Sequence, residues 1–141
     1  MPLMQGETSR RHAMAEVVVD ASALVDLLLG DDFGNAVRRR IAGHALHAPA
    51  HVDAEVLSAL RRLQRAGTIE ADSVETMLHQ LADAPIQRHP VTSLLLGAWG
   101  RRHQLRLADA LYVELAISLG LPLVTTDGRL HLVPVTDIVV G

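Results

Sequence analysis

The sequence predicts an α/β protein, a three-layer α/β/α sandwich with a mainly parallel central sheet. Short runs of β-branched and aliphatic residues alternate along the chain with longer segments of helical periodicity. Strands that alternate with helices require right-handed crossovers, which make the sheet parallel and cover both of its faces. The 141 residues provide room for one domain. We expect residues 16–141 to form it behind a disordered leader at residues 1–15, in which Met14 is a second candidate start.

The first half of the chain carries the boundary signals of strands and helices in alternation. Glycine is expected to close two of the helices, at Gly30 and Gly67, because it adopts the left-handed conformation without steric cost. Thr68 is the expected N-cap of the helix after Gly67, since its hydroxyl can accept a backbone N–H of the first turn. The expected elements are strands at Val17–Val19 and Ala45–Ala48, and helices at Ala21–Leu29, Phe33–Ile41, Val52–Arg65 and from Thr68 to about Ala82.

The second half of the chain continues the alternation. Thr92 is the expected N-cap of one helix, and Gly120 is expected to close the next. Asp127 and Gly128 have the composition of a turn. The expected elements are strands at Pro85–His89 and Leu121–Thr125, helices from Thr92 to about Arg102 and at Ala108–Leu119, and one or two strands within Val133–Val140.

The composition excludes several classes of function. The chain has no cysteine, which rules out a disulfide scaffold, a thiolate zinc site and a cysteine nucleophile. All 13 basic residues are arginine, which argues against P-loop and Schiff-base enzymes, receiver-like switches and haloacid-dehalogenase-type phosphatases, all of which use a lysine. A net charge of −3 and 2% aromatic residues argue against a generally basic or base-stacking nucleic-acid binder. No segment predicts a membrane span or a secretion signal, so the expected location is the cytoplasm.

Four carboxylates that are distant in the sequence are predicted to meet at one edge of the sheet. Asp20 ends the first strand, and Asp127 follows the strand at Leu121–Thr125. Glu55 and Asp109 lie in the first turns of two helices. In a parallel α/β unit, strand ends and helix starts share the edge at which ligands bind. Each acid alone also suits a structural role, as a helix cap, a turn residue or a partner of the helix dipole, so the prediction depends on their coincidence.

A group of carboxylates without cysteine or histidine favours a hard, oxygen-seeking cation, Mg²⁺ or Mn²⁺. Without a cation, such like charges raise one another's pKa or move apart. A divalent cation can lower the pKa of a water molecule and polarise a phosphoryl oxygen, so a phosphodiester is the expected substrate. The histidines His44, His47 and His51 straddle a strand and a loop, and we expect them to be polar surface or partly buried groups rather than a zinc site.

The four acids lie within sequence motifs, which are Val-Val-Val-Asp20-Ala-Ser22, Asp53-Ala-Glu55-Val-Leu, Ala108-Asp109-Ala-Leu-Tyr112 and Thr125-Thr126-Asp127-Gly. In order and spacing they resemble the motifs of PIN-domain nucleases, over about residues 17–140. The compact size and the motif forms resemble the VapC toxins of bacterial VapBC toxin–antitoxin pairs. This resemblance implies a Mg²⁺- or Mn²⁺-dependent endoribonuclease, usually a homodimer, that a cognate VapB antitoxin inhibits.

The resemblance also implies roles for individual residues. By this resemblance, four acids are the metal ligands and the catalytic residues: Asp20, Glu55, Asp109 and Asp127. Ser22 would steady the first acid through its hydroxyl, and Thr125 or Thr126 would support metal-bound water. The family often has Thr or Ser two to three residues before the third acid, as a helix cap. Arg106 and Leu107 stand there in this chain, so Asp109 itself is expected to become the cap.

Arginines are the expected contacts to an RNA substrate, because a guanidinium group binds phosphate bidentately. The candidates are Arg38, Arg62 and Arg102. Tyr112 is expected at the edge of the core or at a dimer contact. Two alternatives remain open at this point: a catalytically silent PIN-fold binding module, and a nuclease with a non-toxin role in RNA processing.

Overall fold

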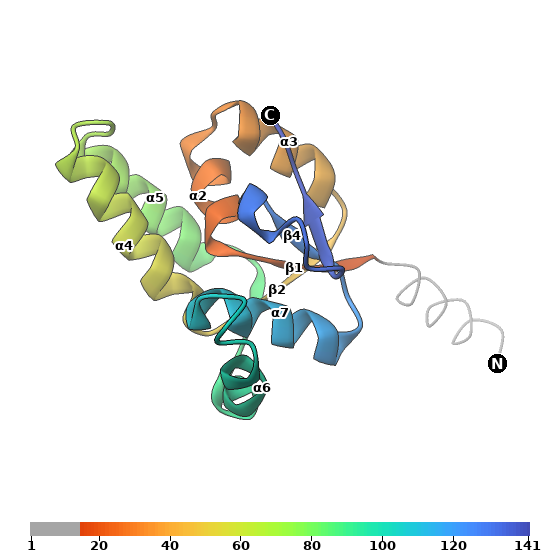
Figure 1. Ribbon diagram of the computed structural model, residues 1–141. Coiled ribbons are helices and arrows are strands. Elements are labelled where there is room, and N and C mark those ends of the chain that lie inside the picture. Colours follow the sequence, from red (N-terminus) through yellow and green to blue (C-terminus); the bar gives the residue numbers. More distant parts are fainter. Residues whose placement is uncertain (1–14) are drawn as a thin grey trace, which may run out of the picture.

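The computed structural model describes residues 15–141 (Figure 1). The predicted leader and Met14 lie outside these residues, except for Ala15. The carbonyl of Ala15 accepts a hydrogen bond from the N–H of Ala45 (2.9 Å), so Ala15 already lies beside the sheet. No helix of the described range is both long and apolar enough to cross a membrane.

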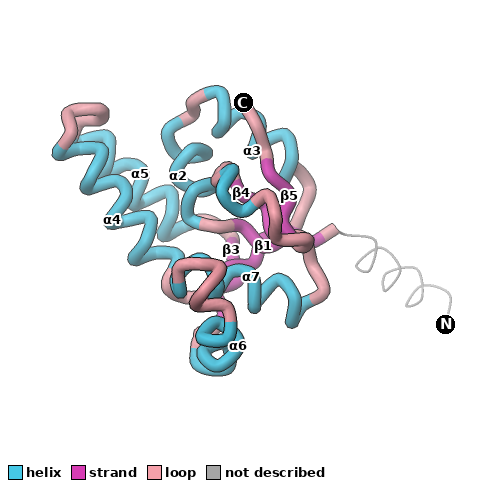
Figure 2. Tube along the Cα trace, in the orientation of Figure 1, coloured by secondary structure: helices cyan, strands magenta, loops and turns pink. Residues whose placement is uncertain are grey.

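The strands of residues 15–141 form one five-stranded sheet in the order β3-β2-β1-β4-β5 (Figure 2). All neighbouring strands are parallel, which confirms the predicted fold class. The region after Val133 contributes one strand. The strands are β1 (Glu16–Val19), β2 (Ala45–Pro49), β3 (Ile86–His89), β4 (Leu123–Thr125) and β5 (Thr136–Ile138).

Helices cover both faces of the sheet. Figure 1 shows α2 and α3 on one side and α7 on the other, with the α4–α5 pair extending away from the sheet. Helix α7 packs against β1, β2 and β4, while α2 packs against β4, α3 and α4. The helices are α2 (Ala21–Leu29), α3 (Asp32–Ile41), α4 (Val52–Arg65), α5 (Ala71–Asp83), α6 (Leu95–Gly100) and α7 (Leu107–Leu119), with 3-10 turns η1 (Thr92–Leu94) and η2 (Gly128–Leu130).

The core is aliphatic and centres on β1. The strand residues Val17, Val18 and Val19 are fully buried, as expected for a central strand with helices on both faces. Val113 and Ala116 of α7 are also fully buried against this cluster. The ends of β1 and β4 and the start of α7 are thus held by the most tightly packed part of the protein.

Three predicted helix caps are wrong. The N–H of Thr68 donates to the carbonyl of Leu63 (2.9 Å) and closes α4 together with the left-handed Gly67, so α5 begins later, with Glu70 as its N-cap. Thr92 lies inside the 3-10 turn η1 and caps nothing, and the helix that follows ends at Gly100 rather than near Arg102.

The third wrong cap is Asp109. Helix α7 begins at Leu107, and the residue before it, Arg106, has the extended backbone of an N-cap. Asp109 is therefore the third residue of α7 and not its N-cap. Its carboxylate contacts the side chain of Arg106.

Candidate active site

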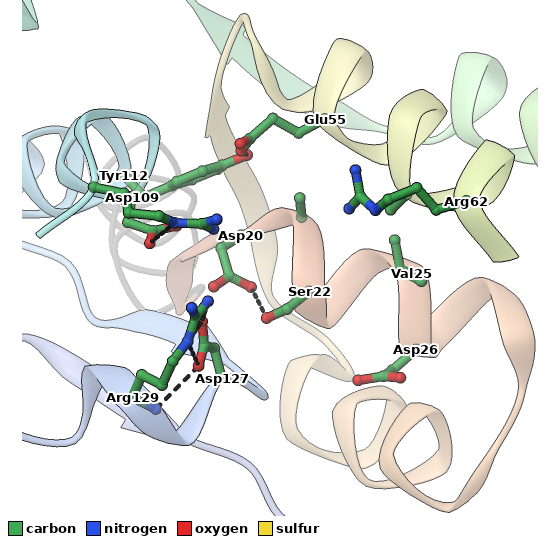
Figure 3. Close-up of a pocket in the computed structure, with 13 residues that line it drawn as sticks. Asp20, Ser22, Val25, Asp26, Glu55, Arg62, Asp109, Tyr112, Asp127 and Arg129 are labelled. Atoms are coloured by element: carbon green, nitrogen blue, oxygen red, sulfur yellow. Dashed lines mark hydrogen bonds and ion pairs between the residues drawn. The ribbon is translucent and has the colours of Figure 1, made fainter.

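The four predicted acids border one cleft of about 300 Å³ beyond the carboxyl ends of the strands. Figure 3 shows Asp20, Asp109 and Asp127 around a common space, with Glu55 above it. The acids come from the end of β1, the first turns of α4 and α7, and the loop between β4 and η2. Asp26 of α2 also lines the cleft and was not among the predicted acids.

Asp20 is buried at the start of α2 and serves that helix as well as the cleft. It is only 5% exposed. Its Oδ1 accepts hydrogen bonds from the Ala23 N–H (2.9 Å) and the Ser22 hydroxyl (2.7 Å). Burial raises the pKa of Asp20 to about 6, and the charge of Asp109 adds to the rise, against the lowering by its hydrogen bonds. Asp20 is therefore both the N-cap of α2 and a carboxylate at the cleft whose burial disfavours its charged form.

Ser22, Thr125 and Thr126 form a hydroxyl network behind the acids. The Ser22 Oγ lies 3.1 Å from the hydroxyl of the fully buried Thr125. The Thr125 hydroxyl also accepts a hydrogen bond from the N–H of Asp127 (2.9 Å), so Thr125 connects the motif of Asp20 and Ser22 with that of Asp127. The Thr126 hydroxyl does not contact these two hydroxyls and donates to Asp26 (2.6 Å). Ser22 and Thr125 are thus the hydroxyls beside the acids, whereas Thr126 orients Asp26.

Glu55 is fixed by Tyr112, which is buried in the core as one of the two predicted locations has it, and whose hydroxyl also reaches the cleft. The Tyr112 hydroxyl donates to Glu55 Oε1 (2.6 Å). Burial and the neighbouring Glu55 raise the pKa of Tyr112 well above its usual value, so the hydroxyl stays a donor. His51 Nε2 lies 3.4 Å from the same Glu55 oxygen. Tyr112 stands three residues after Asp109 on α7, and this helical spacing is the signal that could have placed it at the cleft.

Asp109 and Asp127 are each covered by an arginine. Arg106 Nε lies 3.2 Å from Asp109 Oδ2. Arg129 contacts both oxygens of Asp127, with Nη2 at 2.6 Å from Oδ2 and Nε at 3.0 and 3.1 Å from Oδ1 and Oδ2. The hydrogen bonds from Arg129 hold the pKa of Asp127 below its usual value. Asp127 also accepts the N–H of Arg129 at the start of η2, so its predicted turn role is present too.

The lining of the cleft is suited to a hard divalent cation. Five carboxylates and three guanidinium groups line it, a formal charge of −2 when all are ionised. The donors are carboxylate and hydroxyl oxygens, which Mg²⁺ and Mn²⁺ prefer. Among residues 15–141, no three acidic or histidine side chains converge closely enough to hold a metal as they stand. The donor set and its charge thus fit the cation, while the side chains are engaged with other partners.

The predicted RNA-contacting arginines do not share one location. Arg62 of α4 lines the cleft. Arg38 borders a different hollow, beside α2 and α5, and the guanidinium of Arg102 lies over the ring of Trp99 (4.6 Å). Arg106 and Arg129, which are not among the predicted contacts, also line the cleft.

The three histidines considered for a zinc site belong to separate networks. His44 contacts Arg40 (3.2 Å). His47 bridges Glu16 (2.8 Å) and His89 (2.9 Å). His51 contacts the Ala108 carbonyl (3.1 Å) and stacks near Tyr112, with 4.7 Å between ring centroids.

The chain is similar to a protein family and to relatives that agree with the resemblance of its motifs. Residues 17–135 match the PIN domain family. The chain is 60% identical over 116 residues to ribonuclease VapC3 of Mycobacterium tuberculosis, an alignment that covers 82% of this chain and 85% of the relative. It is 40% identical over 114 residues to ribonuclease VapC12 of the same organism, covering 81% of this chain and 88% of that one.

Solved structures show the same fold. A crystal structure of PAE2754 from Pyrobaculum aerophilum aligns with a TM-score of 0.62 and 27% identity, over 88% of this chain and 81% of that chain. Mycobacterium tuberculosis VapC20, described as a sarcin-ricin loop cleaving toxin, aligns with a TM-score of 0.61 and 18% identity, over 80% and 91% of the two chains. The motifs, the cleft and these alignments together show that the chain belongs to the PIN-domain family and, within it, to the VapC proteins.

Proposed function

We propose that this protein is the toxin of a type II toxin–antitoxin pair, an endoribonuclease that hydrolyses RNA phosphodiester bonds with a carboxylate-bound Mg²⁺ or Mn²⁺. The observation that carries the proposal is the cleft itself, which gathers Asp20, Glu55, Asp109 and Asp127 from four separate segments. The 60% identity to a VapC ribonuclease supports the substrate class. The cation fits because the cleft offers oxygen donors and a formal negative charge.

The residues of the cleft have different proposed roles. The four acids would hold the cation, and the cation, when bound, would polarise the scissile phosphate and make a water molecule more acidic. Ser22 keeps Asp20 oriented, and Tyr112 keeps Glu55 oriented, through their hydroxyl hydrogen bonds. Burial of Asp20 in a poorly solvated position favours an arriving cation, because the cation relieves the cost of its charge.

The partners follow from the same proposal. RNA is the substrate, and we propose a VapB-type antitoxin as the inhibitor and a homodimer as the assembly. A toxin–antitoxin complex from Klebsiella pneumoniae aligns with a TM-score of 0.58 and 15% identity, over 86% of this chain and 96% of that chain, so this fold occurs in such a complex. The cytoplasm, where RNA is available, is the proposed location.

The test is cleavage of a labelled RNA by the purified protein with and without Mn²⁺. The Asp109→Asn variant is expected to lose about 100-fold or more in rate, because a cation ligand is lost while the volume of the side chain is kept. Glu75→Gln, which neutralises an exposed acid of α5, is the matched control and should cleave as the wild type does. Circular dichroism verifies that Asp109→Asn remains folded. Equal rates for Asp109→Asn and the wild type would exclude Asp109 as a ligand.

A catalytically silent PIN-fold binding module is the second candidate. It is favoured by one observation: the carboxylates of the cleft are engaged with a tyrosine, hydroxyls and arginines. Such a module would bind RNA or a partner protein without cleavage. Failure of the wild-type protein to cleave any RNA with Mn²⁺ would support this candidate over the nuclease.

A further inference from the structure

Among the four acids of the sequence motifs, two share a feature that the other two lack: a flexible arginine covers each of them. Asp127 and Asp109 have side chains 16% and 17% exposed, whereas the side chains of Arg129 and Arg106 are each 67% exposed. Each arginine is close to its acid in the sequence, two residues after Asp127 and three before Asp109. Both arginines can therefore leave their acids without any movement of the backbone.

These ion pairs are weakly held. Solvent reaches the guanidinium group of each pair, and an ion pair screened in this way contributes only about 1 kcal/mol or less; the bidentate Arg129–Asp127 pair is the stronger of the two. The fold does not depend on them either: the Asp127 turn is kept by the backbone N–H of Arg129 (3.0 Å), and α7 starts from the backbone of Arg106. The side chains of the two arginines are thus available for another use.

A cation and Arg129 require the same atoms. The Arg129 guanidinium occupies both oxygens of Asp127, and Arg106 occupies Oδ2 of Asp109. A divalent cation that binds Asp127 therefore competes with Arg129 for both oxygens, whereas at Asp109 it competes with Arg106 for one oxygen of the two. Once displaced, each guanidinium remains at the rim of the cleft with its donors unpaired. Its planar arrangement of N–H groups fits a phosphate as well as it fits a carboxylate.

We propose that Arg129 and Arg106 are exchangeable counterions: they neutralise Asp127 and Asp109 in the free protein, give way to the divalent cation, and then bind the phosphodiester of the RNA. This inference rests on the proposed nuclease function and deepens it by naming the side chains that receive the phosphate. The arginines reduce the negative charge of the cleft before the cation arrives, and after the exchange they supply positive charge where the substrate enters.

Arg62 provides an internal comparison. It lines the same cleft from α4, and no hydrogen bond joins it to a carboxylate within the part of the chain that the structure describes. Removal of its charge changes the electrostatic field of the cleft without freeing a carboxylate oxygen. Competition for oxygen atoms is thereby separated from a general effect of charge.

The experiment measures Mn²⁺ affinity by isothermal titration calorimetry in the absence of RNA, for the wild type and for Arg129→Gln, Arg106→Gln and Arg62→Gln. Arg129→Gln is expected to bind Mn²⁺ about 3- to 5-fold more tightly, as expected for loss of one competing ion pair. Arg106→Gln should show a smaller gain, because Arg106 covers a single oxygen. Arg62→Gln should remain within about 2-fold of the wild type.

The same variants are then assayed for RNA cleavage. Arg129→Gln is expected to raise the KM for RNA by about 5-fold or more, because a bidentate phosphate contact is lost. Tighter Mn²⁺ and weaker RNA binding in one variant have opposite signs, which a merely structural role of Arg129 would not produce. Arg129→Lys keeps the charge without the bidentate fork and should fall between Arg129→Gln and the wild type in both measurements.

Two results of the Mn²⁺ titration would overturn the inference: an affinity of Arg129→Gln no tighter than that of the wild type, or an equal gain in Arg62→Gln. A KM for RNA that is unchanged in Arg129→Gln would also overturn it, since no phosphate contact would then have been removed. If the wild type itself neither binds Mn²⁺ nor cleaves RNA, the proposed function fails instead. The two failures are therefore distinguishable.

Discussion

The four acids of the cleft are held in two different ways. Asp20 and Glu55 accept hydrogen bonds from neutral donors, the half-buried Ser22 hydroxyl and the buried Tyr112 hydroxyl. Asp109 and Asp127 are covered by arginines whose side chains are largely exposed. Neutral donors orient a carboxylate and leave its charge in place, whereas a guanidinium group cancels that charge.

This difference shows how one cleft can hold two carboxylates in fixed positions and two whose partners can be exchanged. The buried N–H of Ala23 and the buried hydroxyl of Tyr112 donate to Asp20 and Glu55, so these two carboxylates are positioned before any ligand arrives. The partners of Asp109 and Asp127 can be replaced by another cation.

The largest effect is expected from the cation. Mn²⁺ at one hundred times its Kd should raise the free energy of unfolding by ~2.7 kcal/mol, if it binds only the folded protein. Thermal unfolding with increasing Mn²⁺ measures this shift, with EDTA as the reference state. Asp109→Asn should show a much smaller shift, since a ligand is missing. An unchanged melting temperature at millimolar Mn²⁺ would argue that the acids do not form a cation site.

The burial of Asp20 should be visible as a cost to stability. Its pKa is raised from 3.8 to about 6 in the folded protein, so the folded state loses stability as the pH rises through this interval. In EDTA at pH 8, Asp20→Asn should be more stable than the wild type by about 1–3 kcal/mol, because the amide keeps the cap acceptor and removes the buried charge.

Chemical denaturation at several pH values measures this gain. The difference between Asp20→Asn and the wild type should be small below about pH 4 and complete above about pH 6, the interval between the two pKa values. A variant that is less stable than the wild type at pH 8 would mean that the charge of Asp20 contributes net stability to the cap.

The smallest effect is expected from the hydroxyl of Tyr112. Tyr112→Phe should lower the free energy of unfolding by about 1 kcal/mol, because one hydrogen bond is lost while water can still reach the partly exposed Glu55. The kcat should fall by about 10-fold if the orientation of Glu55 matters. Ser118→Ala removes a hydroxyl from the same helix, away from the cleft, and should leave kcat unchanged. A kcat of Tyr112→Phe equal to that of Ser118→Ala would remove Tyr112 from the site.

Much of the fold was predictable because local signals and packing agree. The apolar run at Val17–Val19 and the glycines after α2 and α7 mark elements that the structure confirms. The failure at Thr68 has a physical cause: its backbone N–H completes the end of α4, and that function takes precedence over its capacity as a helix cap. A residue that suits two boundaries cannot be assigned from its type alone.

The location of the acids was predictable, but their partners were not. Strand ends and helix starts follow from topology, so the convergence of Asp20, Glu55, Asp109 and Asp127 on one cleft could be derived. The covering of Asp127 by Arg129 depends on the rotamer of a long side chain, which carries no signal in the hydrophobic pattern. Tyr112 differs from these partners, because its helical spacing from Asp109 is a signal in the sequence.

The double use of Asp20 affects how related sequences should be compared. An inactive descendant of this protein would still require an acceptor for the N–H of Ala23, and Asp20 would be retained to start its helix. Asp109 caps nothing, so a descendant freed from selection for cleavage would lose it without harm to the fold. Among homologues, position 109 is therefore the better indicator of which proteins still cut RNA.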